Sequence, residues 1–185
     1  AEKVVAAFGP HARVAELQPL PGDASSRRYF RATLEGNGRP RSAMVMSWSE
    51  VGLPVSSEEL MIFGKPLEEL PFLNVHRFLK GIGVRVPKVY GHWVDEGLML
   101  LEDLGDVSLW DRVRRAPEDD VTKWYRKAID VLVTLQVRGT RARDKSCIAF
   151  QQTFDGHLYL WELAHFTQYG LEQGGGGSLP DTERK

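Results

Sequence analysis

An unbroken apolar run that ends in carboxylates constrains the fold of this chain more than any other stretch. Residues 98–101 are all large and apolar, and three carboxylates follow within residues 102–106. A short run of this kind is typical of a strand that is buried on both faces. Because strand-like segments precede the run and helix-like segments follow it, we interpret residues 102–107 as a hinge between two lobes. A core strand followed by an ordinary acidic turn is the alternative interpretation.

The segments before the hinge favour a β-rich half. Turn-rich loops at residues 19–26 and 35–40 predict antiparallel hairpins. Apolar residues from Phe72 to Ile82 recur at helical spacing, and Gly81 and Gly83 end that helix. We therefore expect about five antiparallel strands with one helix packed on them. The strand-like segments are residues 12–17, 27–34, 42–48, 84–95 and 98–101.

The segments after the hinge favour a helical half. Ser108 is placed to cap a short helix over residues 108–113. Residues 121–135 follow the helical period, and the acidic residues 119–120 suit the positive N-terminal end of a helix. Residues 138–146 are basic, and we expect them to form a loop.

A last apolar helix is predicted over residues 158–169, ending at Gly170. It is apolar almost all round, so it requires burial on several sides. If this surface is exposed, we expect it to favour self-association. The glycine-rich residues 174–178 have the composition of a flexible linker.

Charge and composition exclude several classes of function. The net charge is −1, so nothing in the composition indicates binding to nucleic acid or to a membrane surface. The longest apolar runs are far too short to span a bilayer, and the first residues lack the pattern of a secretory signal. The single cysteine, Cys147, fits a reducing compartment. We therefore expect a cytoplasmic protein.

Three stretches resemble the N-terminal part of the aminoglycoside phosphotransferase family, whose members have a kinase-like bilobal fold and transfer phosphate from ATP to small molecules. Residues 21–31, PGDASSRRYFR, resemble the loop that covers the phosphates and the strand after it. Residues 86–90, VPKVY, resemble the strand after the N-lobe helix, and residues 100–106, LLEDLGD, resemble the hinge. The combination is most similar to the branch that phosphorylates the anomeric hydroxyl of N-acetylmuramate and N-acetylglucosamine. Residues 154–171 are similar to a helical segment of that branch.

The resemblance implies an α+β fold with four parts. These are a kinase-like N-lobe at residues 1–101, a hinge at 102–107, part of a helical C-lobe at 108–172 and a flexible tail or linker at 173–185. It also implies ATP and Mg²⁺ as cofactors and an amino sugar as the acceptor.

The resemblance also implies where a nucleotide binds. The backbone carbonyl of Glu102 and the N–H of Leu104 would bind adenine, and its ring would be flanked by Leu20, Met44 and Leu101. Plain core packing is the alternative interpretation of these three side chains. A glycine beside small hydroxyl residues lets backbone N–H groups approach phosphate oxygens, and arginine suits bidentate phosphate binding. The expected phosphate-binding residues are Gly22, Asp23, Ala24, Ser25, Ser26, Arg27 and Arg28.

The chain departs from the kinase pattern in two ways. The strand at 42–48 has no lysine and the helix at 72–77 has no glutamate, so both partners of the usual ion pair are missing. We expect an arginine within residues 27–31 to replace the lysine. None of the five histidines is followed two residues later by aspartate, so the family's catalytic loop is absent from these residues.

We therefore expect no catalytic and no metal-binding residues in this chain, which would be a fragment without turnover of its own. Two alternatives stay open. One is a non-catalytic binding module built on a kinase-like lobe. The other is a kinase of the same family that acts on an aminoglycoside or on a choline-like alcohol.

Overall fold

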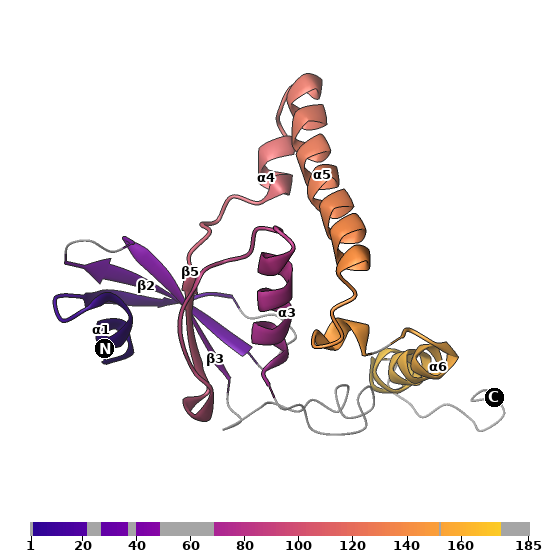
Figure 1. Ribbon diagram of the computed structural model, residues 1–185, viewed down its shortest axis with the longest axis horizontal. Helices are drawn as coiled ribbons and strands as arrows, with labels where there is room; N and C mark the ends of the chain where they lie inside the picture. The colour runs from indigo at the N-terminus through magenta and orange to yellow at the C-terminus, as the bar shows by residue number, and fades with distance from the viewer. Residues whose placement is uncertain (1, 22–26, 37–39, 49–68, 152, 175–185) are drawn as a thin grey trace.

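A computed structural model describes residues 2–21, 27–36, 40–48, 69–151 and 153–174. A β-rich half is followed by a helical half, and helix α3 lies between the sheet and the helices that come after β5 (Figure 1). The predicted mixture of one antiparallel sheet and several helices is confirmed. The predicted linker at 174–178 lies, beyond Gly174, outside the described residues.

Five strands form one antiparallel sheet in the order β1-β2-β3-β5-β4. The last strand in sequence, β5, therefore lies inside the sheet, between β3 and β4. Its residues Met99, Leu100 and Leu101 are at most 5% exposed, which confirms a strand buried on both faces. The strands are β1 (Arg13–Pro19), β2 (Arg27–Glu35), β3 (Ser42–Trp48), β4 (Val89–Trp93) and β5 (Leu98–Glu102).

Two core clusters lie on the two faces of this sheet. Helix α1 (Glu2–Phe8) contributes Val4 to a cluster that includes Leu100. Leu70, which precedes helix α3 (Pro71–Gly81), belongs to the other cluster, together with Leu101. Because successive residues of a strand point to opposite faces, β5 supplies side chains to both clusters.

A tight turn joins β4 to β5. The short 3-10 helix η1 (Val94–Glu96) ends at Gly97, which has a left-handed backbone with φ of 62°. A Cβ atom at this position would lie 2.4 Å from the carbonyl oxygen of Trp48. Only glycine combines this dihedral with this close approach, so Gly97 fixes the point where β5 enters the sheet.

The helical half begins with α4 (Leu109–Val113), whose N-terminus has the predicted cap. The Ser108 hydroxyl accepts a hydrogen bond from the Asp111 N–H, and the Asp111 carboxylate accepts one from the Ser108 N–H. This is a capping box. Helix α5 (Glu118–Ala142) follows, with three acidic residues in its first turn.

The loop predicted for residues 138–146 is wrong in its first part, because α5 continues to Ala142. Gly139 is buried and approaches Phe78 and Ile82 of the α3 region. Arg138 donates a hydrogen bond from Nη1 to the Ile82 carbonyl at 3.0 Å. Packing against α3 thus stabilises helical turns whose polar sequence favoured a loop.

Two other element boundaries also differ from expectation. Residues 84–88 form an irregular connection, so β4 begins only at Val89. The last helix does not end at Gly170, because α6 (Gly156–His165) continues as the π-helix η3 (Phe166–Gln173). Most of its apolar side chains are exposed, among them Leu160, Leu163 and Phe166. The expectation of self-association through this surface stays a prediction.

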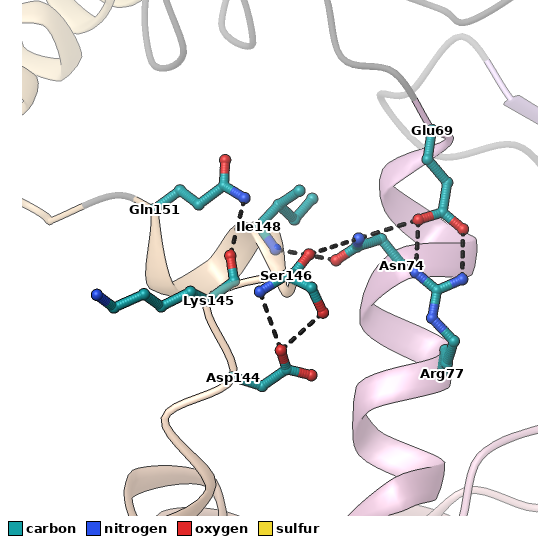
Figure 2. Close-up of polar contacts among 8 residues, drawn as sticks. All are labelled: Glu69, Asn74, Arg77, Asp144, Lys145, Ser146, Ile148 and Gln151. Atoms are coloured by element: carbon teal, nitrogen blue, oxygen red, sulfur yellow. Dashed lines mark hydrogen bonds and ion pairs between the residues drawn. The ribbon is translucent and has the colours of Figure 1, made fainter.

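Asn74 joins α3 to the segment after α5 through its buried side chain (Figure 2). Its Nδ2 donates to Glu69 Oε2 and to the Ser146 carbonyl, each at 3.0 Å. Its Oδ1 accepts from the Ile148 N–H at 2.9 Å. Ile148 begins the 3-10 helix η2 (Ile148–Phe150). One side chain of the β-rich half therefore binds the backbone of the helical half on both sides of Cys147.

Among the described residues, no helix is both long enough and apolar enough to cross a membrane.

Candidate functional site

Met44 and Leu101 lie opposite each other on neighbouring strands. They are Cα partners in the antiparallel register of β3 and β5, and both contact the core cluster on the α3 face. Leu101 is 5% exposed, whereas Met44 is only partly buried. The two predicted ring-flanking residues are therefore brought together on one face of the sheet, at the end of β5 that leads into the hinge.

The hinge begins where β5 leaves the sheet. The N–H of Glu102 donates to the Lys88 carbonyl at 2.8 Å, and its carboxylate accepts from the Lys88 N–H at 3.0 Å. Leu104 follows outside the sheet and is 63% exposed. Among the described residues, no backbone carbonyl accepts a hydrogen bond from its N–H. The chain thus carries an accessible N–H donor two residues after the last strand residue.

Arg31 of β2 connects this hinge to the sheet. Its Nε and Nη2 donate to the two oxygens of Asp103 at 2.8 and 3.2 Å. Its Nη1 and Nη2 donate to the two oxygens of Asp106 at 2.9 and 2.7 Å. The Asp103 side chain is 7% exposed and that of Asp106 is 76% exposed. The guanidinium therefore binds two hinge carboxylates at once. Each contact is bidentate, which fixes the orientation of the guanidinium relative to the carboxylates.

The hinge cluster of Arg31, Asp103 and Asp106 shifts the pKa values of Arg31 and Asp103. Burial raises the pKa of Asp103, but hydrogen bonds from Arg31, the Gly105 N–H and Ser42 lower it by more, so it lies below its ordinary value. Hydrogen bonds to Asp106 and Asp103 raise the pKa of Arg31. The contacts between Arg31 and Asp103 therefore favour the charged form of both side chains.

Sequence reasoning placed a phosphate-binding arginine within residues 27–31, and the structure separates the candidates. All three nitrogens of Arg31 already donate to carboxylates. Arg27 and Arg28 are exposed near the start of β2. By strand alternation Arg27 lies on the same face as Tyr29, which packs on the α3 side with Met44, and Arg28 lies on the opposite face.

The five predicted loop residues, Gly22, Asp23, Ala24, Ser25 and Ser26, lie outside the described residues. Their expected role in phosphate binding stays a prediction.

The described residues do not fit a Mg²⁺ site. Mg²⁺ is usually held by one or two free carboxylates beside the substrate phosphates. At the hinge, Asp103 and Asp106 share the single positive charge of Arg31, so neither carboxylate is without a protein partner. In the part of the chain that the structure describes, no group of three or more His, Cys, Asp or Glu side chains could hold a metal ion.

The hinge cluster was not visible in the sequence. Arg31 is separated from Asp103 by 72 residues and from Asp106 by 75 residues, so no local spacing links them. The one available signal in the sequence was an arginine that alternates with apolar residues along a predicted strand. Two of the three hydrogen bonds of Asn74 were equally hidden, because their partners, the Ser146 carbonyl and the Ile148 N–H, lie 72 and 74 residues away.

Comparison with known proteins gives a distant match. Over 122 residues the chain is 33% identical to the N-acetylmuramate/N-acetylglucosamine kinase of Pseudomonas aeruginosa strain PAO1. The aligned part is 66% of this chain but only 30% of that kinase, so the chain spans less than a third of the relative's length. No family model matches the chain. The similarity supports a kinase-type relationship for this mixed α+β chain.

Proposed function

We propose that this chain is the nucleotide-binding part of an ATP-dependent phosphotransferase that acts on an amino sugar. The observation that carries the proposal is the hinge. A buried strand ends at Glu102, an accessible N–H follows at Leu104, and Arg31 holds the intervening backbone through Asp103. The similarity to a sugar kinase over 66% of the chain is consistent with this assignment.

Adenine would bind through backbone groups of the hinge. The Leu104 N–H donates to a ring nitrogen and the Glu102 carbonyl accepts from the exocyclic amine, as the kinase resemblance implies. Met44 and Leu101, which pair across β3 and β5, offer apolar surface to one face of the ring. In this proposal the hinge cluster keeps the donor and the acceptor at a fixed separation, which lowers the entropic cost of binding.

Arg27 is the proposed phosphate-binding residue of β2. It shares the α3 face with Met44 and Leu101, whereas Arg28 lies on the opposite face and Arg31 is bound to the hinge carboxylates. An arginine offers bidentate, charge-assisted hydrogen bonds to phosphate oxygens. This would replace the lysine that kinases usually carry on the third strand.

The proposal also covers the acceptor and the catalytic groups. The relative's name gives N-acetylmuramate and N-acetylglucosamine as its substrates, and we propose the same acceptor class here. The base that orients the acceptor hydroxyl and the ligands of Mg²⁺ would come from residues other than those described.

Calorimetric titration of the purified chain with ATP and with adenosine tests the phosphate assignment. Arg27→Ala should weaken ATP binding about tenfold or more and leave adenosine binding unchanged, because a charge-assisted bond contributes more than ~1.4 kcal/mol. Arg28→Ala is the matched control, since it removes the same charge from the opposite face. Equal losses in both variants would contradict the assignment of Arg27.

A second candidate function is a non-catalytic binding module. The absence of a histidine–x–aspartate sequence from all 185 residues favours it for this chain taken alone. The discriminating assay is phosphate transfer from ATP to N-acetylmuramate by the full-length protein. Transfer supports the kinase, and nucleotide binding without transfer to any sugar, aminoglycoside or choline supports the module.

A further inference from the structure

A cleft lies at the edge of the sheet, between α3 and the connection to β4. It has a volume of about 930 Å³, within the range of small-molecule sites. One wall is a row of α3 side chains that includes Leu73, His76 and Lys80, and the other is the irregular segment 84–88. His76 Nε2 lies 2.7 Å from the Pro87 carbonyl, which ties the two walls together.

The charges around this cleft are unbalanced. Four basic side chains line it, Arg77, Lys80, Arg85 and Lys88, against the carboxylates of Glu69 and Glu102. The whole chain, in contrast, has a net charge of −1. A cluster of one sign in a chain that is otherwise nearly neutral concentrates counter-ions at that place.

Both carboxylates are already engaged. Glu69 accepts two hydrogen bonds from Arg77, each at 2.7 Å, which lower its pKa together with one from Asn74. Glu102 accepts the Lys88 N–H at 3.0 Å and lies 3.9 Å from Arg85.

This leaves two lysines for a ligand. Within the described ranges, the ammonium groups of Lys80 and Lys88 form no ion pair with a protein carboxylate. They are therefore available to an anion that enters the cleft.

Apart from these charged groups and the two histidines His76 and His92, the lining is apolar or aromatic and comes from both walls. It consists of Leu73, Val84, Val86, Pro87, Val89 and Tyr90. An apolar lining with two available ammonium groups does not match a bare inorganic ion, which would leave the apolar surface uncovered. It matches a molecule with one anionic group and one hydrophobic body.

We propose that this cleft binds a small amphipathic anion, a phosphate or carboxylate attached to an apolar body. The ammonium groups of Lys80 and Lys88 bind the anionic group, and the aliphatic lining packs on the apolar body. The site differs from the hinge, which offers the backbone of Leu104. Only the Glu102 residue is shared, with its side chain in the cleft and its carbonyl in the proposed adenine site.

Phenyl phosphate is a suitable probe, observed by the amide chemical shifts of residues 80–92 in titrations of the full chain. We expect saturable shifts in this segment, weaker binding of inorganic phosphate, and no competition by adenosine. The double variant Lys80→Ala/Lys88→Ala should weaken phenyl phosphate about tenfold or more. Both side chains are exposed, so the fold should be unaffected.

Lys123→Ala/Lys127→Ala is the matched control, because it removes two exposed charges from α5 and should leave binding unchanged. Three results would overturn the proposal. These are no shifts in residues 80–92 at millimolar probe, equal weakening in both double variants, or displacement of the probe by adenosine. Equal affinity for inorganic phosphate would likewise contradict a role for the apolar lining.

Discussion

Replacing Asn74 with alanine should destabilise the link between the two halves of the chain. The side chain is 6% exposed and makes three hydrogen bonds, to Glu69, to the Ser146 carbonyl and from the Ile148 N–H. At about 1 kcal/mol net for each bond, their loss costs about 3 kcal/mol. Alanine regains roughly 0.6 kcal/mol through its higher helix propensity. We expect a net loss of about 2–3 kcal/mol.

Urea denaturation followed by circular dichroism measures this loss from the shift of the midpoint at constant slope. Hydrogen exchange of the Ile148 amide reports the broken bond directly, because that N–H donates to Asn74 Oδ1. Gln151→Ala is the matched control. It removes one exposed side-chain bond, to the Lys145 carbonyl, from the same segment, and should change stability by less than about 0.5 kcal/mol.

Two outcomes would refute this reasoning. One is a loss for Asn74→Ala below about 1 kcal/mol with unchanged protection of the Ile148 amide, which would show that the side chain does not join α3 to η2. The other is a similar loss for Gln151→Ala, which would show that the whole segment tolerates no substitution.

Other predictions concern the hinge cluster and the β4–β5 turn. The pKa of Asp103 is lower in the folded chain than in the unfolded chain, so its stabilisation is present above its unfolded pKa and is lost as the pH falls through the folded value. Urea midpoints should therefore drop below about pH 4, and Asp103→Asn should have a smaller drop; an identical pH profile in both proteins would contradict this. Gly97→Ala should lose at least about 1–2 kcal/mol in the same assay, because its φ is 62° and its Cβ would meet the Trp48 carbonyl. Gly81→Ala, with no atom within 4 Å of its Cβ, should be neutral, and equal effects of the two substitutions would argue against strain at Gly97.

Local patterns predicted the elements that depend on local chemistry. The apolar run at 98–101 predicted a strand buried on both faces, and Ser108 predicted a capped helix. Both rest on residues a few positions apart, whose spacing is visible in the sequence. The boundary errors have the opposite cause. Residues 138–142 are helical because Gly139 and Arg138 contact the α3 region more than 50 residues away.

The candidate site was predictable only in part, for a similar reason. Strand alternation predicts the face of the sheet on which each of Met44 and Leu101 lies. Their pairing, however, joins β3 to β5, which are not consecutive strands. The partners of Arg31 depend on β5 entering the sheet beside β3, a non-consecutive neighbour that no local pattern specifies. The hinge at residues 102–107 stays a prediction, and the contacts of Arg31 with Asp103 and Asp106 were not predictable from local patterns.

Nucleotide affinity of a hinge variant tests the central claim most directly. Leu104→Pro removes the backbone N–H that is proposed to bind adenine, whereas Leu104→Ala keeps it and removes only an exposed side chain. Titration calorimetry with ATP, on variants whose circular dichroism matches the parent chain, should show binding for the parent and for Leu104→Ala. It should show none for Leu104→Pro. Unchanged ATP affinity in a folded Leu104→Pro chain would contradict the proposed adenine site.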